Sequence, residues 1–151
     1  MNCLKTNFYI QEVVYTNFLT LSVNLLGGFN MLRSLMQVYV KGSIEAVNLY
    51  QKAFNAEILC LYPDDQGGYM HSELNVHGQV LAVSEITEKP IEGNNMQFCF
   101  HFGEGGEIHV KKAYEVLKDE ATIHVPIGPC DYSPCMFSLV DKFGVYWCLF
   151  V

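Results

Sequence analysis

The chain of 151 residues has few basic side chains and no long apolar run. Nine Lys and Arg stand against sixteen Asp and Glu, which leaves a formal net charge of −7. An acidic chain without a basic cluster attracts neither a phosphate backbone nor an anionic lipid surface, so we expect no nucleic-acid partner and no membrane partner. No apolar run approaches the roughly 18 residues that a membrane-spanning helix needs. The hydrophobic fraction of 50% excludes a disordered chain.

Several motifs that carry chemistry are also missing. The six cysteines include no C-x-x-C pair, which argues against a zinc knuckle or a thioredoxin-like redox site. The chain has no P-loop, no glycine-rich dinucleotide loop and no G-x-S-x-G nucleophile elbow, so we expect no nucleotide-derived or other cofactor. No secretory signal is recognisable, and we therefore expect reduced thiols and a cytoplasmic location.

The first 30 residues differ from the rest, because they hold only two charged side chains, Lys5 and Glu12. Two interpretations of this N-terminal extension stay open. Gly27 and Gly28 precede Met31 at a spacing that fits a ribosome-binding site read in frame, in which case Met31 is the natural start. Alternatively, the strand-forming composition of the extension predicts a hairpin added to the edge of a sheet. In both cases we expect residues 31–151 to form a single domain.

From residue 36 onward, hydrophobic periodicity predicts the same order of elements twice. The first half is predicted to form a strand at 36–40, a helix at 43–54 and strands at 57–62, 69–76 and 79–85. The second half is predicted to form a strand at 96–102, a helix at 107–119 and strands at 121–125, 136–140 and 145–151. We expect Ser43 to cap the first helix, Asn55 to end it, and residues 126–134 to form a loop. The chain thus contains two β-α-β-β-β modules, at about 36–89 and 96–151, joined by a linker at 90–95.

Four segments resemble those of a known family in their residue sequences and in their order along the chain. They read GSIEAVNLY at 42–50, MHSEL at 70–74, VSE at 83–85 and DKFGVYW at 141–147. Together they resemble the PhnB-like branch of the vicinal oxygen chelate superfamily, which includes glyoxalase I, extradiol dioxygenases and bleomycin-resistance proteins. The resemblance implies an α+β fold in which two βαβββ modules form a cupped, mostly antiparallel sheet with helices outside and a cavity inside. It also implies a homodimer, since superfamily members usually pair and open sheet edges need cover. It implies no single reaction, because this fold hosts many.

Strand alternation separates polar from apolar side chains on the predicted strands. The apolar faces should pack on the helices, and the polar faces should line the cavity or remain solvated without a function. The residues predicted to turn to the helices are Met70, Leu74, Phe98 and Phe100. The residues predicted to bind a ligand are Gln37, Tyr39, His71, Glu73, Gln97, His101 and Cys148. Among these, His71 and Glu73 are the candidate catalytic pair, because an imidazole and a carboxylate on one face suit proton transfer.

The resemblance also locates the metal ligands of metal-dependent superfamily members. Their four positions correspond to Leu35, Ser84, Gln97 and Cys148, or to Glu85 and Trp147 after a shift of one residue. A hard divalent ion prefers oxygen and imidazole ligands, which this set largely lacks. We therefore expect no metal at the usual site. A different site, built from His71, Glu73 and His101, stays open because two imidazoles and a carboxylate suit several transition metals.

Two classes of function follow. The first is a PhnB-like protein that binds an unidentified small molecule in a cavity without the usual superfamily metal site, in the manner of the bleomycin-resistance proteins. The alternative is an enzyme of the lyase, isomerase or dioxygenase type, in which His71, Glu73 and His101 act as acid/base groups or metal ligands.

Overall fold

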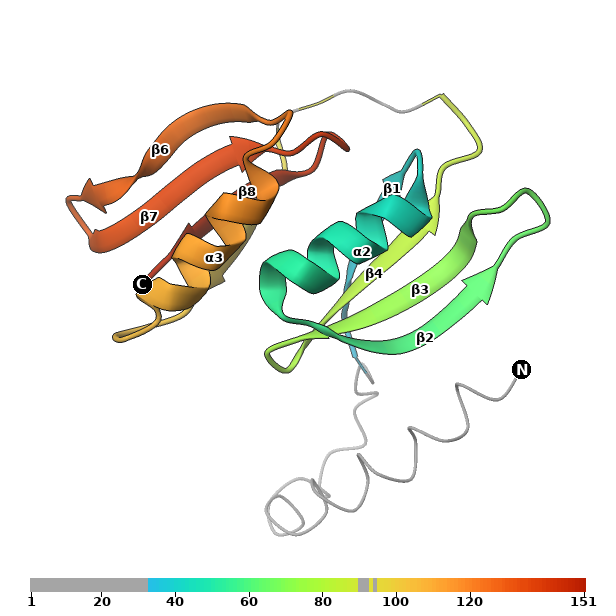
Figure 1. The fold of residues 1–151 in the computed structure, drawn as a ribbon, viewed down its shortest axis with the longest axis horizontal. Coiled ribbons are helices and arrows are strands. Elements are labelled where there is room, and N and C mark those ends of the chain that lie inside the picture. Colours follow the sequence, from blue (N-terminus) through green and yellow to red (C-terminus); the bar gives the residue numbers. More distant parts are fainter. Residues whose placement is uncertain (1–32, 90–92, 94) are drawn as a thin grey trace, which may run out of the picture. The chain divides into compact units, whose positions relative to one another are not determined.

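The computed structural model describes residues 33–89, 93 and 95–151, of which residues 35–151 belong to one compact unit. The two interpretations of the N-terminal extension and most of the predicted linker concern residues outside this part. Within it the protein has two four-stranded sheets and two helices, which confirms the predicted α+β class (Figure 1). No helix in the described part of the chain is long and apolar enough to cross a membrane.

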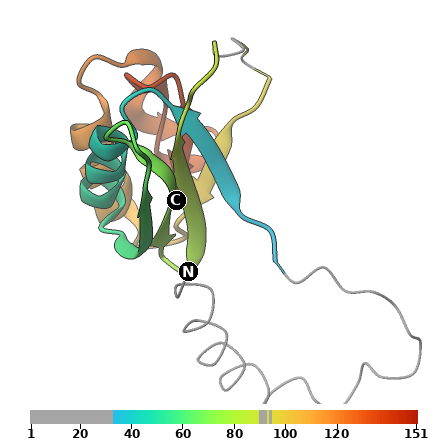
Figure 2. The same cartoon turned by 90° about the vertical axis from the view of Figure 1, so that its right-hand side faces the viewer.

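The first module is a mixed sheet with one helix. Its elements are β1 (Met36–Val40), α2 (Ser43–Phe54), β2 (Glu57–Pro63), β3 (Tyr69–Val76) and β4 (Gln79–Glu85). The strand order is β1-β4-β3-β2, in which β1 runs parallel to β4 and the other neighbours are antiparallel. In Figure 2 the turquoise helix α2 lies against one face of the strands, so the two faces of this sheet have different surroundings.

The second module repeats this topology. Its elements are β5 (Phe98–His101), α3 (Glu107–Leu117), β6 (Thr122–Cys130), β7 (Ser133–Val140) and β8 (Tyr146–Phe150). The strand order is β5-β8-β7-β6, again with the first strand parallel to the last and the other pairs antiparallel. The repeat of two βαβββ modules that the sequence predicts is therefore confirmed.

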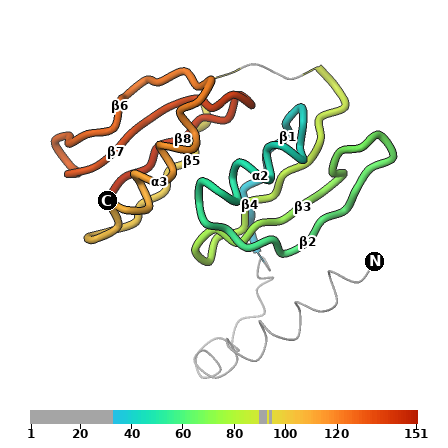
Figure 3. The backbone as a smooth tube through the Cα atoms, viewed as in Figure 1, coloured from blue at the N-terminus to red at the C-terminus, as the bar shows by residue number. Residues whose placement is uncertain are grey.

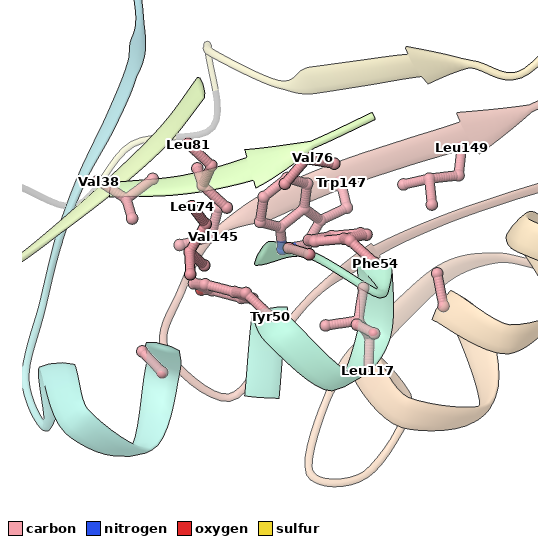
Figure 4. Close-up of a cluster of buried hydrophobic side chains, with 14 of the residues drawn as sticks. Val38, Tyr50, Phe54, Leu74, Val76, Leu81, Leu117, Val145, Trp147 and Leu149 are labelled. Atoms are coloured by element: carbon pink, nitrogen blue, oxygen red, sulfur yellow. The ribbon is translucent and has the colours of Figure 1, made fainter. Parts of the chain in front are cut away.

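A shared hydrophobic core joins the two modules. Helices α2 and α3 contact each other, and the buried cluster takes side chains from both sheets. Its centre is the chain's single tryptophan, Trp147 of β8, which is fully buried. The Trp147 ring lies 5.1 Å from the ring of Phe54 and 5.4 Å from that of Tyr50, both on α2 (Figure 4). The faces of the sheets that contribute to this core are therefore occupied, and their opposite faces are the ones that can serve a ligand.

The N-terminus of α2 is held differently from the prediction. The helix follows Gly42, whose φ of 86° lies in the left-handed region that favours glycine, and the Ser43 side chain does not cap it. Instead, the Ser43 hydroxyl accepts a hydrogen bond of 2.8 Å from the backbone N–H of Tyr69. The carboxylate of Glu85 accepts the N–H groups of Gly42 and Ser43 at 2.8 and 2.6 Å. Asn55 ends the helix in the left-handed conformation, as expected.

The predicted loop at 126–134 is wrong. Strand β6 continues to its end at Cys130, and β7 already begins at Ser133, so only Asp131 and Tyr132 form the turn of a long hairpin (Figure 3). The prolines of this segment suggested a loop, but β6 is an edge strand with several register shifts against β7. Proline is tolerated in such a strand, because an edge strand does not need every N–H for pairing.

The orientation predicted for Met70 is also wrong, since its side chain is 66% exposed. The register between β2 and β3 shifts at this point: Tyr62 pairs with His71, whereas Pro63 pairs with Tyr69. Met70 is therefore the extra residue of a β-bulge, which breaks the alternation of side chains. Tyr69 packs against the core in its place.

Candidate functional site

The polar face of each sheet lies opposite the helices, as alternation predicts. In β3, Leu74 is fully buried in the core, while His71 is partly exposed. In β5, Phe98 and Phe100 pack against the core, while His101 is exposed. These orientations place the predicted polar residues on the faces that the core leaves available.

The polar face of the first sheet centres on a histidine–carboxylate pair. The His71 Nε2 atom lies 3.1 Å from Glu73 Oε1, although their spacing along the strand alone does not require a contact. The side chain of His71 is 32% exposed, whereas that of Glu73 is only 10% exposed. The ring of Tyr62, paired with His71 across β2 and β3, stacks on the imidazole with a centroid separation of 6.3 Å. The result is an imidazole held between a phenol ring and a largely buried carboxylate.

This pair has a definite chemical capacity. The hydrogen bond to Glu73 fixes the orientation of the imidazole. Since Nε2 of His71 faces Glu73, Nδ1 is the ring atom that can make a further hydrogen bond. When Nε2 donates its hydrogen to Glu73, the neutral imidazole offers Nδ1 as an acceptor for an O–H or N–H group of a ligand.

Strand β1 extends the same polar face. The Gln37 side chain donates a hydrogen bond of 3.1 Å to the hydroxyl of Ser84 on β4. Tyr39, the next residue on this face, pairs in register with Ser84 and is 64% exposed. Gln37 is thus held in place, whereas Tyr39 offers an accessible aromatic side chain.

The polar face of the second sheet carries the other predicted residues. The Gln97 side chain donates to the hydroxyl of Ser138 at 3.2 Å and accepts a hydrogen bond from the Cys99 thiol at 3.5 Å. The imidazole of His101 stacks on Phe150 with ring centroids 4.6 Å apart and nearly parallel planes. This face therefore presents an amide group and an imidazole, the latter stacked on an aromatic ring.

Cys148 lies on the same face but is almost buried, with 7% exposure. Burial first, and then the neighbouring thiols of Cys99 and Cys130, raise the pKa of the Cys148 thiol to about 11. The thiol is therefore protonated at neutral pH and acts as a weak hydrogen-bonding group.

The structure collects the predicted residues in two groups, one on each sheet. Gln37, Tyr39, His71 and Glu73 belong to the first group, and Gln97, His101 and Cys148 to the second. A pocket of about 380 Å³ is lined by residues of both modules, but His101 is the one predicted residue among those lining it. Alternation predicts the face of a residue within its sheet, but it contains nothing about how two sheets pack. For this reason the sequence pattern predicts one set of ligand-binding residues, whereas the structure divides them between the two sheets.

Sequence reasoning missed three partners on these faces. Tyr62 and the two hydroxyls of Ser84 and Ser138 contact predicted site residues. The signal for Tyr62 was strand pairing, because a residue opposite His71 in register must lie on the same face. Ser84 lies at one of the metal-ligand positions that the resemblance implies, and the hydrogen bond that it accepts from Gln37 gives it a different role.

The possible metal site of His71, Glu73 and His101 is not formed. Across residues 33–89, 93 and 95–151, no three His, Cys, Asp or Glu side chains are grouped so that they could hold a metal ion. At the metal-ligand positions implied by the resemblance, two side chains already make other hydrogen bonds. Glu85 accepts the backbone N–H groups at the start of α2, and Gln97 donates to Ser138. These residues do not fit a hard divalent ion, which needs several available oxygen or imidazole ligands.

Comparison with solved structures identifies the fold. The PhnB protein from Bacillus cereus matches with a TM-score of 0.67 and 21% identity, over 78% of this chain and 98% of that chain. The chain has the fold of the PhnB-like proteins. Protein PA1353 from Pseudomonas aeruginosa matches with a TM-score of 0.66 and 19% identity, over 80% of this chain and 97% of that chain. The vicinal oxygen chelate fold predicted from the four sequence segments is thereby confirmed.

A third neighbour has a known ligand. A variant of the fosfomycin resistance protein FosX from Listeria monocytogenes, complexed with Mn(II) and 1S,2S-dihydroxypropylphosphonic acid, matches with a TM-score of 0.59. The identity is 16%, over 83% of this chain and 93% of that chain. Neither the protein-family models nor the curated proteins match this chain. At these identities the likeness concerns the fold, and the residues must supply the argument for function.

Proposed function

We propose that the protein binds a small molecule through the polar face of its first sheet, with His71 as the central contact. The observation that carries this proposal is the hydrogen-bonded pair of His71 and the buried Glu73. An imidazole oriented by a carboxylate offers its other ring nitrogen as a directed hydrogen-bonding group for one polar atom of a ligand. The Glu73 side chain is only 10% exposed, whereas a polar residue without a function on this face would remain in contact with water.

Aromatic side chains next to the pair favour a ligand with a flat or apolar part. Tyr62 stacks on His71, and Tyr39 on β1 is largely exposed on the same face. Aromatic faces bind planar groups by stacking, while the imidazole fixes one polar atom. The ligand class that fits is therefore a small aromatic or carbonyl-bearing molecule that contacts the protein without a metal. The fold supports a small-molecule role, since FosX is complexed with a small phosphonic acid.

The acid/base role predicted for His71 and Glu73 stays a prediction, because no observation favours turnover over binding. We also infer that the protein forms a homodimer, in which a second copy covers exposed apolar side chains such as Met70. Sedimentation of the chain as a monomer at micromolar concentration would contradict the dimer. The cytoplasmic location stays a prediction.

The binding proposal is tested with a panel of small aromatic acids, phenols and ketones. A thermal-shift screen selects the compound that raises the melting temperature most, and calorimetry then measures its affinity. We expect His71→Ala to weaken binding about tenfold, because a polar atom of the ligand that loses its hydrogen-bond partner costs about 1–3 kcal/mol. His109→Ala is the matched control, since His109 lies on α3 with its ring against His77 and Phe102. Equal loss in both variants, or no loss in either, would show that the site is elsewhere.

A further inference from the structure

A pair of cysteines on the second sheet has a placement that the binding proposal does not use. Strands β5 and β8 are parallel neighbours, and their register sets Cys99 directly beside Cys148. Side chains paired in register lie on the same face of a sheet. Neighbouring strands are about 4.8 Å apart, and the Cα atoms of disulfide-bonded cysteines lie about 4.4–6.8 Å apart. The backbone therefore already brings these two residues within bridging range.

We propose that Cys99 and Cys148 are a modification site, at which a peroxide converts the two thiols into a reversible disulfide bond. The Cys99 side chain is also close enough to Cys148 to contribute to the raised pKa of the Cys148 thiol. This inference concerns the second sheet and does not rest on the ligand proposed for the first.

The two cysteines differ in a way that assigns their roles. Cys99 is exposed, so a dissolved peroxide can reach its sulfur. Cys148 is almost buried, and burial keeps its thiol protonated, which makes it a poor first nucleophile. Cys99 is therefore the residue that meets the oxidant, and Cys148 is the resolving residue.

The reaction balances with hydrogen peroxide as the oxidant. The Cys99 thiolate attacks one peroxide oxygen, so that an S–O bond forms, the O–O bond breaks and hydroxide leaves as water after taking up a proton. The Cys148 sulfur then attacks the Cys99 sulfur, the S–S bond forms, and the S–O oxygen leaves as a second water with the proton of Cys148. Two thiols are oxidised by two electrons in total, and one peroxide is reduced to two waters.

The position of β5 makes closure feasible. Among the described strands it is an edge strand that pairs with β8 alone, so a small shift of β5 disturbs one row of backbone hydrogen bonds. Formation of the disulfide would also remove the hydrogen bond that the Cys99 thiol donates to Gln97. It would change the lining of the pocket that contains Cys99 and His101. Oxidation at this pair would thus alter the polar face of the second sheet.

A third thiol provides the main competitor. Cys130, at the end of β6, is close enough to influence the titration of both Cys148 and Tyr132. Unlike Cys99, Cys130 is not paired in register with Cys148, because Cys148 pairs with Ser138 on β7. The register argument therefore favours Cys99 as the partner of Cys148.

The test uses the full chain with Cys60→Ser, since this substitution simplifies the peptide map. Trypsin does not cleave between Lys89 and Pro90, so Cys99 becomes the sole cysteine of peptide 53–111 and Cys148 is the sole cysteine of peptide 143–151. The protein is treated with hydrogen peroxide, alkylated, digested without reductant and analysed by mass spectrometry. We expect a loss of two free thiols per chain, a linked 53–111/143–151 peptide, and recovery of both thiols with dithiothreitol.

Two further variants keep the proposal falsifiable. Cys99→Ser should abolish the linked peptide without preventing folding, because Cys99 is exposed at a sheet edge. Cys130→Ser should leave the linked peptide intact. A link between Cys130 and Cys148, a link between two chains, or oxidation of Cys99 to sulfinic acid in place of pairing would each overturn the proposal.

Discussion

Asp141, the first residue of the DKFGVYW segment, has a structural role. Its side chain is 4% exposed and accepts hydrogen bonds of 2.8 Å from both the Tyr50 hydroxyl and the Trp147 indole N–H. It also accepts the backbone N–H groups of Phe143 and Val145 at 2.9 and 3.0 Å. Burial first, and then the Asp141 charge, raises the pKa of Tyr50 well above its usual range. One carboxylate therefore accepts hydrogen bonds from the backbone of the turn before β8 and from the polar atoms of two core rings.

Replacing this carboxylate should be costly. In Asp141→Ala, the buried donors of Tyr50 and Trp147 lose their acceptor, and each unsatisfied buried donor costs about 1–3 kcal/mol. We expect a decrease of about 3 kcal/mol or more in the free energy of unfolding, measured by urea denaturation. Asp131→Ala is the control, since Asp131 lies exposed in the β6–β7 turn and should change stability by less than about 0.5 kcal/mol. Similar values for both variants would contradict the structural role of Asp141.

At the scale of elements, α2 depends on a carboxylate from another strand. Glu85 ends β4 and accepts the N–H groups of Gly42 and Ser43 at the positive end of the helix dipole. Burial opposes ionisation of Glu85, but the hydrogen bonds from Ser43 and Gly42 outweigh it and lower the pKa of this carboxyl. A capping group supplied by a distant strand cannot be recognised from the local sequence, which is why Ser43 was predicted instead.

This arrangement predicts an acid-dependent contribution to stability. Because the pKa of Glu85 is lower in the folded state, its stabilising effect is present above the ordinary value of about 4.5 and is lost as the pH falls through the folded-state pKa. Glu85→Gln should therefore lower the free energy of unfolding by about 1 kcal/mol at pH 7, and the difference from wild type should shrink below pH 4.5.

Urea denaturation between pH 3 and pH 7 measures this difference, with Glu104→Gln as the control. Glu104 is exposed in the turn before α3, so its substitution should have no comparable effect. A constant difference between Glu85→Gln and wild type across the pH range would contradict ionic capping.

The sequence predicts elements better than it predicts their contacts. The bounds of β1, β3 and β4 agree with the predicted ranges, because alternation and turn residues act locally. The β6–β7 hairpin was missed because its prolines are acceptable only at a bulged edge strand. The bulge at Met70 interrupts alternation without a local signal. For the candidate site, the faces of His71 and His101 were predictable, whereas their separation on two sheets depends on how the modules pack.

At the scale of the whole described unit, the modules share one core instead of having two. Phe54 on α2 of the first module contacts the rings of Phe100 and Trp147 in the second, with centroid distances of 5.3 and 5.1 Å. Hydrophobic burial scales with the area that both modules lose from water together. Neither module can therefore unfold without exposing the core face of the other, and we expect the two to unfold cooperatively.

Trp147 makes this expectation measurable, because it is the single tryptophan of the chain and reports on the second module. Its fluorescence and the far-ultraviolet circular dichroism of the whole chain should give coincident urea transitions. Phe54→Ala removes a buried ring from the first module and should lower the free energy of unfolding by about 3–5 kcal/mol. If the core is shared, both transitions move together to lower urea. Ile108→Ala, at a position that is 70% exposed on α3, should leave both in place. A tryptophan transition that stays at its wild-type urea concentration in Phe54→Ala would mean that the modules unfold independently.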